Sequence, residues 1–288
     1  MIDPTFFSKL DALSLTLRRQ SFGKYQGDQK TAYVGDGLTF KDFSPYTLGD
    51  DFRKIDWRVY ARTKELYVRR YEADKNLTIH VLLDSSASMG YKPSPNAKSK
   101  FDFAATMALG IAHVAQKQQE RVEFSLFSHK IIPLKNQNQQ VHVQQLATKL
   151  NNTKPKHEGD LGETLKKYTQ NVKSKSLLFI VSDFLYPPEE LAKILKLYQK
   201  SQVFLIHVLH HDEITLPFEG DTKFVNPENE SESVRAYVSP SLQRKYQKEM
   251  IKHTLALKQT CGKKAKYVQI NTFDPAIRSF MKLWSSMS

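Results

Sequence analysis

Five short runs of apolar residues recur along the second part of the chain, with longer segments between them. The runs are nearly continuous in hydrophobicity rather than alternating, which is typical of parallel strands covered on both faces. They predict strands over residues 77–83, 121–127, 177–182, 202–209 and 266–270.

Most of the segments between and after these runs space their apolar residues by three and four positions, as amphipathic helices do. Two segments begin with a capping-box spacing, in which Ser99 precedes Asp102 and Asp160 precedes Glu163. The patterns predict helices over residues 99–118, 160–172, 187–200, 239–262 and 274–284. Because strands and helices alternate over residues 76–288, we expect an α/β domain with a mostly parallel sheet and helices on both faces.

Residues 1–75 have a different pattern. Glycine and aspartate interrupt hairpin-like pieces there, and aspartates alternate densely with arginines. We therefore expect an irregular, β-containing N-terminal segment, residues 1–75, that packs on a main domain formed by residues 76–288.

The amino-acid composition is that of a globular protein and says little more about the fold. Hydrophobic residues make up 40% and charged residues 25% of the 288 positions, as in an ordinary soluble protein. No apolar run reaches the length of a membrane span, and the first residues lack the pattern of a signal peptide. The single cysteine, Cys261, excludes an internal disulfide and suits a reducing compartment, so we expect a cytoplasmic protein.

The formal net charge of +13 raises the question of an acidic partner. Residues 240–266 carry eight lysines and arginines against Glu249 alone. The favoured interpretation is a solvated helix face beside an apolar stripe. Nucleic-acid binding is the alternative, and it rests on charge alone because no stacking platform or Cys/His finger accompanies the patch.

Acidic residues follow two of the predicted strands directly. Asp84 follows the first strand and Asp183 the third, and ligands of such sheets gather beyond the carboxyl ends of the strands. The spacing of Asp84, Ser86 and Ser88 places a carboxylate and two hydroxyls in one tight loop. Such hard oxygen donors suit Mg²⁺ or Mn²⁺ and are poor for zinc. The alternative is that the serines simply fill a turn.

Two stretches resemble known families. Residues 77–92 together with Asp183 resemble the von Willebrand factor type A domain and its metal-ion-dependent adhesion site. Residues 46–62 resemble the signature of the bacterial domain-of-unknown-function 58 family. Every fixed position of that signature is present: Tyr46, Gly49, Asp50, Asp51, Arg53, Ile55, Asp56, Trp57, Ala61 and Arg62.

The resemblance implies a Rossmann-like A-type domain that presents a divalent cation to a partner protein. Asp84, Ser86 and Ser88 would hold the metal, and Asp183 would contribute either directly or through a neighbouring ligand. A carboxylate of the partner would take the open position. The resemblance also implies an AAA+ ATPase of the MoxR type as partner, with this chain acting as a co-chaperone or assembly factor.

One position departs from the family pattern. The family usually supplies a threonine to the metal site from a loop that aligns here with residues 158–165, and Gly159 stands in its place. The neighbouring Asp160 could approach the metal itself. An ordinary role for Asp160 as a helix N-cap is at least as good an interpretation.

The acids and arginines around Trp57 also have two interpretations. They could form a docking surface or a catalytic cluster, or Asp50, Asp51 and Asp56 could pair with Arg53, Arg58 or Arg62 to pin irregular backbone. We favour the structural role.

The histidines of residues 207–211 are not expected to share a metal. His207 lies within an apolar run, and the side chains of His210 and His211 diverge on extended backbone.

No catalytic residue is predicted. Position 86 is a serine, so the D-x-D of haloacid-type phosphatases is missing, and neither a dinucleotide fingerprint nor a nucleophile elbow follows the first strand. Metal-dependent hydrolysis stays open as an alternative, although no general base is evident.

Overall fold

The computed structural model describes residues 4–12, 34–35, 39–72, 77–135, 142–172, 175–229, 231–262 and 265–287. The chain divides into two compact units, a small one of residues 22–76 and a large one of residues 1–21 with 77–288. Residues 13–33 and 36–38 of the predicted N-terminal segment lie outside the described residues. The predicted packing of residues 1–75 on the main domain stays a prediction.

A six-stranded sheet forms the centre of the large unit; five of its strands match the predicted apolar runs, and the short edge strand over residues 131–133 is not predicted. Its spatial order is β11-β8-β7-β4-β5-β6, and every neighbouring pair is parallel except β5 with β6. The strands are β4 (Thr78–Asp84), β5 (Arg121–Phe127), β6 (Ile131–Pro133), β7 (Ser176–Ser182), β8 (Gln202–Leu209) and β11 (Ala265–Asn271).

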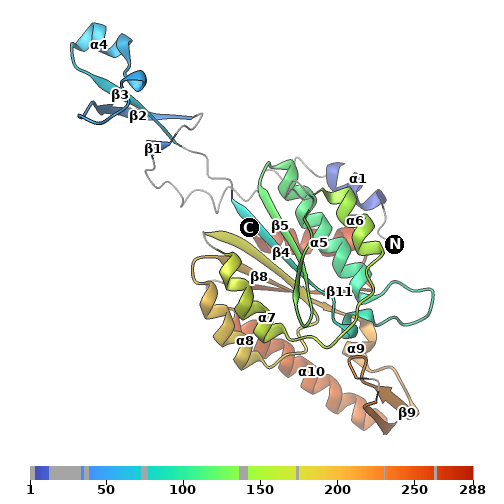
Figure 1. Cartoon of the computed structure of the whole chain (residues 1–288). Coiled ribbons are helices and arrows are strands. Elements are labelled where there is room, and N and C mark those ends of the chain that lie inside the picture. The colour runs from blue at the N-terminus through green and yellow to red at the C-terminus, as the bar shows by residue number, and fades with distance from the viewer. Residues whose placement is uncertain are drawn as a thin grey trace. The chain divides into compact units, whose positions relative to one another are not determined.

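Helices cover both faces of this sheet (Figure 1). One face carries α1 (Pro4–Ala12), α5 (Lys100–Lys117), α6 (Val143–Asn151) and α11 (Ala276–Met287). The other carries α7 (Leu161–Tyr168), α8 (Pro188–Leu195) and α10 (Pro240–Thr260). Short helical turns η3 (Ala87–Gly90), η4 (Thr169–Asn171), η5 (Lys196–Tyr198) and α9 (His211–Thr215) complete the unit. The predicted α/β fold is confirmed.

The strand order creates a crevice between β4 and β7. From β4 the chain continues to β5 on one side, and from β7 it continues to β8 on the other side. The helix that follows β4 therefore covers one face of the sheet, whereas the helix that follows β7 covers the other. At such a switch point the loops after the two strands part and leave a crevice beyond their carboxyl ends. Asp84 ends β4 and Asp183 follows β7, so the fold brings both to this crevice.

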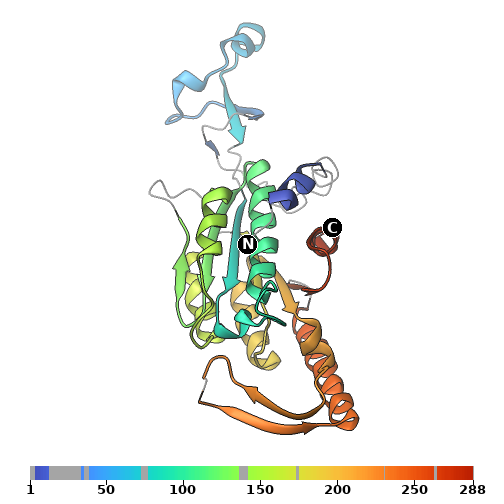
Figure 2. The same ribbon diagram turned by 90° about the vertical axis from the view of Figure 1, so that its right-hand side faces the viewer.

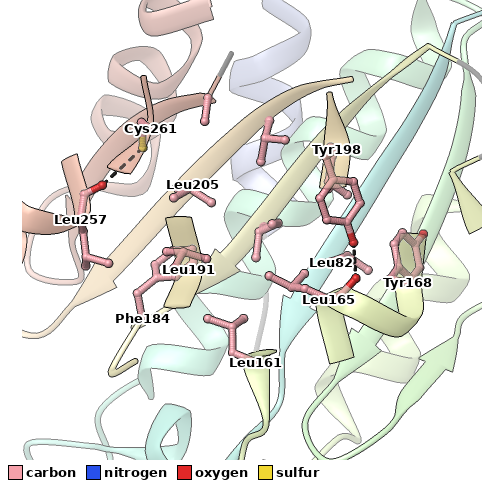
Figure 3. Packing of buried hydrophobic residues seen from close by; sticks show 14 of the residues in the cluster. Leu82, Leu161, Leu165, Tyr168, Phe184, Leu191, Tyr198, Leu205, Leu257 and Cys261 are labelled. Atoms are coloured by element: carbon pink, nitrogen blue, oxygen red, sulfur yellow. Dashed lines mark hydrogen bonds between the residues drawn. The ribbon is translucent and has the colours of Figure 1, made fainter. Parts of the chain in front are cut away.

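Close packing fills the space between the sheet and helices α7, α8 and α10. Figure 3 shows Leu82 of the sheet beside Leu161 and Leu165 of α7 and Tyr198, whose hydroxyl donates to the Leu165 carbonyl. Cys261 is buried in the same cluster, and burial raises the pKa of its thiol to about 11. The single cysteine is therefore a packed residue of low reactivity.

Helix α5 approaches its neighbours on the opposite face through a glycine. A Cβ atom on Gly110 would fall 2.6 Å from Cε2 of Phe280 and 3.1 Å from Cε1 of Phe6. The rings of Phe6 and Phe280 meet edge to face, with their centroids 5.9 Å apart. The missing side chain of Gly110 thus lets α1 and α11 pack directly on α5.

The small unit contains an antiparallel sheet of order β1-β3-β2. Its strands are β1 (Val34–Gly35), β2 (Thr39–Pro45) and β3 (Tyr67–Glu72). The connection between β2 and β3 holds the turn η2 (Phe52–Lys54) and the helix α4 (Trp57–Thr63). Residues 46–62 occupy this connection.

An exposed hairpin joins α9 to α10 in the large unit. Its strands, β9 (Gly220–Val225) and β10 (Ser233–Val238), pair only with each other among the described residues. In Figure 2 the hairpin, in orange, extends beneath the end of the sheet at which β4 ends. The hydrophobic pattern does not predict these strands.

Candidate functional site

Asp84 is fixed at the end of β4 by two hydrogen bonds. Its Oδ1 accepts from the backbone N–H of Ser86 at 2.8 Å, and its Oδ2 accepts from the Ser182 hydroxyl at 2.6 Å. Ser182 is the last residue of the neighbouring strand β7. The carboxyl group is buried. Because one hydrogen bond comes from the loop after β4 and the other from β7, both sides of the crevice set its position.

The two serines of the loop present their hydroxyls side by side. Ser86 caps the turn η3 and Ser88 lies within it, and their Oγ atoms are 3.1 Å apart. Two oxygens at right angles in an octahedral shell of roughly 2.1 Å radius stand about 3 Å apart, so this spacing fits neighbouring ligands of Mg²⁺. Both residues are buried at the crevice.

Asp183 is paired with a buried lysine. The ammonium of Lys100 lies 2.8 Å from its Oδ2 and 2.5 Å from Oε1 of Glu213 in α9. Although burial opposes ionisation, the charge of Lys100 lowers the pKa of Asp183. The two nearby carboxylates likewise raise the pKa of Lys100 against the effect of its burial.

Asp84 has the opposite electrostatic environment. Burial first, and then the charge of Asp183, raise its pKa to about 7. Among the described residues no cationic side chain pairs with Asp84, whereas Lys100 pairs with the neighbouring Asp183. A divalent cation at Asp84 would relieve this cost, because an opposite charge favours the ionised carboxylate.

A cavity of about 190 Å³ opens over these groups. The loops after β4 and β7, the residues around Gly159 and the tip of the β9–β10 hairpin surround it. Its lining residues are Asp84, Ser86, Ser88, Phe127, Gly159, Leu161, Ser182, Asp183, Phe184, Leu185, Tyr186, Asn226, Pro227 and Glu228.

Glu228 brings a third carboxylate to the cavity from the hairpin. Its Oε2 accepts from the backbone N–H of Gly159 at 3.3 Å. Burial raises the pKa of Glu228, whereas the Gly159 N–H and the Ser88 hydroxyl favour its charged form. No motif in the sequence marks this residue as part of a site.

Gly159 and Asp160 differ in their relation to the cavity. Gly159 lines it, and a Cβ atom there would lie 3.0 Å from Cβ of Ser86, too close for a threonine without a shift. Asp160 is exposed and caps helix α7, where its Oδ1 accepts from the Glu163 N–H at 2.9 Å. The Thr164 hydroxyl donates to the Ser128 carbonyl.

The donors at the crevice fit a hard cation. Within the described residues, no group of three or more His, Cys, Asp or Glu side chains is arranged to hold a metal ion. A metal at this position would therefore depend on Asp84, the hydroxyls of Ser86 and Ser88, and water. This set of oxygens suits Mg²⁺ or Mn²⁺, which retain several waters, better than zinc.

Comparison with known sequences identifies the family. The family described as "Protein of unknown function DUF58" matches residues 42–256. The chain belongs to this family. It is 26% identical over 269 residues to the "Uncharacterized protein Rv1480" of Mycobacterium tuberculosis, covering 90% of this chain and 83% of that protein. The "Uncharacterized protein Mb1516" of Mycobacterium bovis matches with the same identity and coverage.

Solved structures with a related arrangement share little sequence. The SpRpn10 VWA domain aligns with 8% identity and a TM-score of 0.42, over 72% of this chain and 94% of that one. Proximal thread matrix protein 1 from the mussel byssus, "with zinc occupied MIDAS motif", aligns with 13% identity and a TM-score of 0.42, over 75% of this chain and 48% of that one. Strand order and crossovers, rather than these likenesses, define the fold.

The acids of the family signature have local structural roles. Oδ1 of Asp56 caps α4 by accepting from the N–H groups of Arg58 and Val59, and its Oδ2 lies 2.8 Å from Nε of Arg69. The partner of Asp56 is thus Arg69 on strand β3, which is not among the arginines Arg53, Arg58 and Arg62 that the sequence suggests. Oδ1 of Asp51 accepts from the N–H of Arg53 and lies 3.5 Å from its Nε.

The remaining signature positions divide between turn and surface. Asp50 accepts from the N–H and hydroxyl of Thr47, and the φ angle of +113° at Gly49 in this turn favours glycine. The side chains of Phe52 and Trp57 are 66% and 60% exposed. Tyr46 is half-buried, and its backbone N–H donates to the Leu66 carbonyl. Ile55 is buried, whereas Arg53, Ala61 and Arg62 are exposed.

The histidines of residues 207–211 have other partners. Nδ1 of His207, in the core, lies 2.5 Å from the Tyr267 hydroxyl. His210 caps α9, and Glu213 closes that capping box while its other oxygen binds Lys100. The backbone cap thus holds Glu213 in place beside the buried ammonium.

The basic side chains of α10 face solvent. Arg244, Lys245, Lys248, Lys252 and Lys258 are exposed. Lys263 and Lys264 lie outside the described residues. Among the described residues, no helix combines the length and apolar character that crossing a bilayer requires.

Proposed function

We propose that this chain is a non-enzymatic protein-interaction module in which Asp84, Ser86 and Ser88 hold Mg²⁺ or Mn²⁺. When bound, the ion supplies an open coordination position for a carboxylate of a partner protein. The chain's own part is to hold three oxygen donors in place at the crevice and to shield them from bulk water.

The convergence of Asp84, Ser86 and Ser88 at the switch point of the sheet is the observation that carries this proposal. Three features support it: the 3.1 Å spacing of the hydroxyls, the burial of Asp84 with no cationic partner in the described part of the chain, and the cavity above both. Hydrogen bonds from Ser86 and Ser182 fix the Asp84 carboxylate in advance, which reduces the entropy lost on binding.

We assign Asp183 an indirect part. Lys100 pairs with the Asp183 carboxylate, and the Ser88 hydroxyl lies beside it, so Asp183 orients a ligand, while Asp84 supplies the negative charge that contacts the ion. One ionised acid at the ion leaves more of its positive charge for a partner carboxylate than two would.

An AAA+ ATPase of the MoxR type is the partner that the family resemblance supports. In this proposal the chain acts as a co-chaperone or assembly factor, and an aspartate or glutamate on the ATPase or its client completes the coordination. The net charge of +13 on this chain would also attract an acidic partner surface.

A capture experiment tests this function. The purified chain is immobilised and presented with the MoxR-type ATPase of the same organism, in Mg²⁺ or in EDTA, using wild type, Asp84→Ala and Asp274→Ala. Asp274 is a matched control, because it is an exposed acid that follows the last strand of the sheet. We expect capture in Mg²⁺ by wild type and Asp274→Ala only. Equal capture in EDTA would remove the ion from the interaction.

A further inference from the structure

The tip of the β9–β10 hairpin covers the candidate metal site. Asn226, Pro227 and Glu228 line the cavity above Asp84 and Ser88. The hairpin lies between α9 and α10, and no strand of the central sheet pairs with it among the described residues. The tip thus reaches the site from outside the sheet (Figure 2).

Hydrogen bonds within the tip fix the direction of Glu228. The N–H of Asn226 donates to the Glu232 carbonyl at 2.9 Å, which closes the turn between the strands. Oδ1 of Asn226 then accepts from the N–H of Glu228 at 3.0 Å. A side chain that bonds the backbone two residues on fixes a local turn, so the backbone at Glu228 is held before any ligand arrives.

The Glu228 carboxylate lies next to the position at which the family usually has a threonine. Its Oε2 lies 3.3 Å from the N–H of Gly159, and its Oε1 would be 3.6 Å from a Cβ atom at that glycine. The Ser88 hydroxyl and the carboxylates of Asp183 and Glu158 are further polar neighbours of Glu228. The acid from the hairpin and the loss of a side chain at position 159 are therefore complementary.

We propose that Glu228 is a built-in ligand, which takes the coordination position that a partner's carboxylate would otherwise occupy and so caps the metal site from within the chain. This inference rests on the proposed function. A partner then binds only by displacing the hairpin tip, which makes the hairpin a competitive gate on the site.

The hairpin is suited to such a release. A two-stranded ribbon is marginally stable on its own, and only Val238 of its strand residues is buried. The hydrogen bond from Gly159 to the Glu228 carboxylate is long, at 3.3 Å, and therefore weak. A tethered carboxylate has an effective concentration in the millimolar range, so free carboxylates compete poorly and a partner needs further contacts to displace it.

The test compares Glu228→Gln with Asp221→Asn. Asp221 lies on strand β9, is exposed and does not line the cavity, so its substitution removes the same charge from the same hairpin. Mn²⁺ affinity is measured from the electron paramagnetic resonance signal of the free ion. Hydrogen exchange of residues 220–238 is measured with and without Mn²⁺, and Asp84→Ala is the control for the site itself.

We expect Mn²⁺ to slow hydrogen exchange of the hairpin tip in wild type and in Asp221→Asn, but not in Glu228→Gln. We also expect Glu228→Gln to weaken Mn²⁺ binding by at least about tenfold, the loss that follows even when an outer partner of a metal ligand is removed. Mn²⁺ binding and hairpin protection equal to wild type in Glu228→Gln would overturn the cap while leaving the metal site intact. Mn²⁺ binding that Asp84→Ala does not reduce would overturn both proposals.

Discussion

The ammonium of Lys100 lies 2.8 Å from the carboxylate of Asp183, and both groups are buried beneath the candidate metal site. This ion pair links the first turn of α5 to the end of β7, and through Glu213 it extends to α9. It neutralises one of the two acids that the strands bring to the crevice. The other acid, Asp84, is thereby distinguished as the group that gains most from a cation.

Replacement of Lys100 should therefore be costly. In Lys100→Met the carboxylates of Asp183 and Glu213 would lose their shared cation, and breaking a buried pair costs about 3–5 kcal/mol of the free energy of unfolding. The measurement is urea denaturation at neutral pH. The exposed Lys98, two residues earlier, provides the control Lys98→Met. A Lys100→Met protein as stable as this control would contradict the assigned role of the pair.

His80 should make stability depend on pH. Burial lowers its pKa to about 4, against an opposing effect of Glu123. Because the folded pKa lies below the unfolded value of about 6.5, the neutral histidine contributes full stability above that pH. Stability is lost as the pH falls from about 6.5 towards 4, by up to about 3 kcal/mol.

Urea denaturation between pH 8 and pH 4.5 measures this loss. His80→Asn should reduce the slope of stability against pH, whereas His142→Gln, at an exposed position ahead of α6, should keep it. Equal slopes for His80→Asn and wild type would exclude His80 as the source.

Gly110→Ala should destabilise the large unit despite the better helix propensity of alanine. The substitution gains at most about 1 kcal/mol in an ordinary helix, but here the new Cβ would lie 2.6 Å from the Phe280 ring. Overpacking of this kind costs roughly 1–3 kcal/mol. Thermal unfolding provides the measurement, and the double variant Gly110→Ala, Phe280→Leu should recover part of the loss. Additive losses would show that the two residues do not clash.

Two variants of Asp56 should separate the cap of α4 from the ion pair with Arg69. Asp56→Asn keeps an oxygen that can accept from the N–H groups of Arg58 and Val59, whereas Asp56→Ala keeps neither interaction. Limited proteolysis within residues 39–72 should therefore be fastest for the alanine variant and intermediate for the asparagine variant. Equal cleavage of all three proteins would remove the cap from the account.

The sequence predicts the central sheet well, because buried parallel strands have a strong pattern. The run predicted over residues 77–83 corresponds to β4 at Thr78–Asp84, and that over 202–209 coincides with β8. The same pattern locates the two acids of the candidate site, because Asp84 and Asp183 come directly after such runs. Helix ends are less accurate, and the last helix runs over Ala276–Met287 rather than ending at Trp284.

The parts of the site that the sequence does not reveal depend on tertiary contacts. Lys100 follows a helix N-cap, where a charged residue is normally solvated, and only the neighbouring strand end and α9 make it a buried cation. Glu228 comes from a hairpin whose short strands are mostly exposed and mix polar with apolar residues, so they lack the continuous apolar runs of the sheet. Glu213 could have been placed near the start of a helix from the sequence, because it follows His210 by three residues, the spacing of a capping box.

Calorimetric titration with Mn²⁺ shows whether Asp84, Ser86 and Ser88 hold an ion, because it measures ion binding without any partner. Wild type, Asp84→Ala, the double variant Ser86→Ala, Ser88→Ala and the control Asp274→Ala are compared at neutral pH. We expect one bound ion in wild type and Asp274→Ala, and loss of that ion in the other two variants. Equal Mn²⁺ binding by wild type and Asp84→Ala, or no binding by wild type, would contradict this expectation.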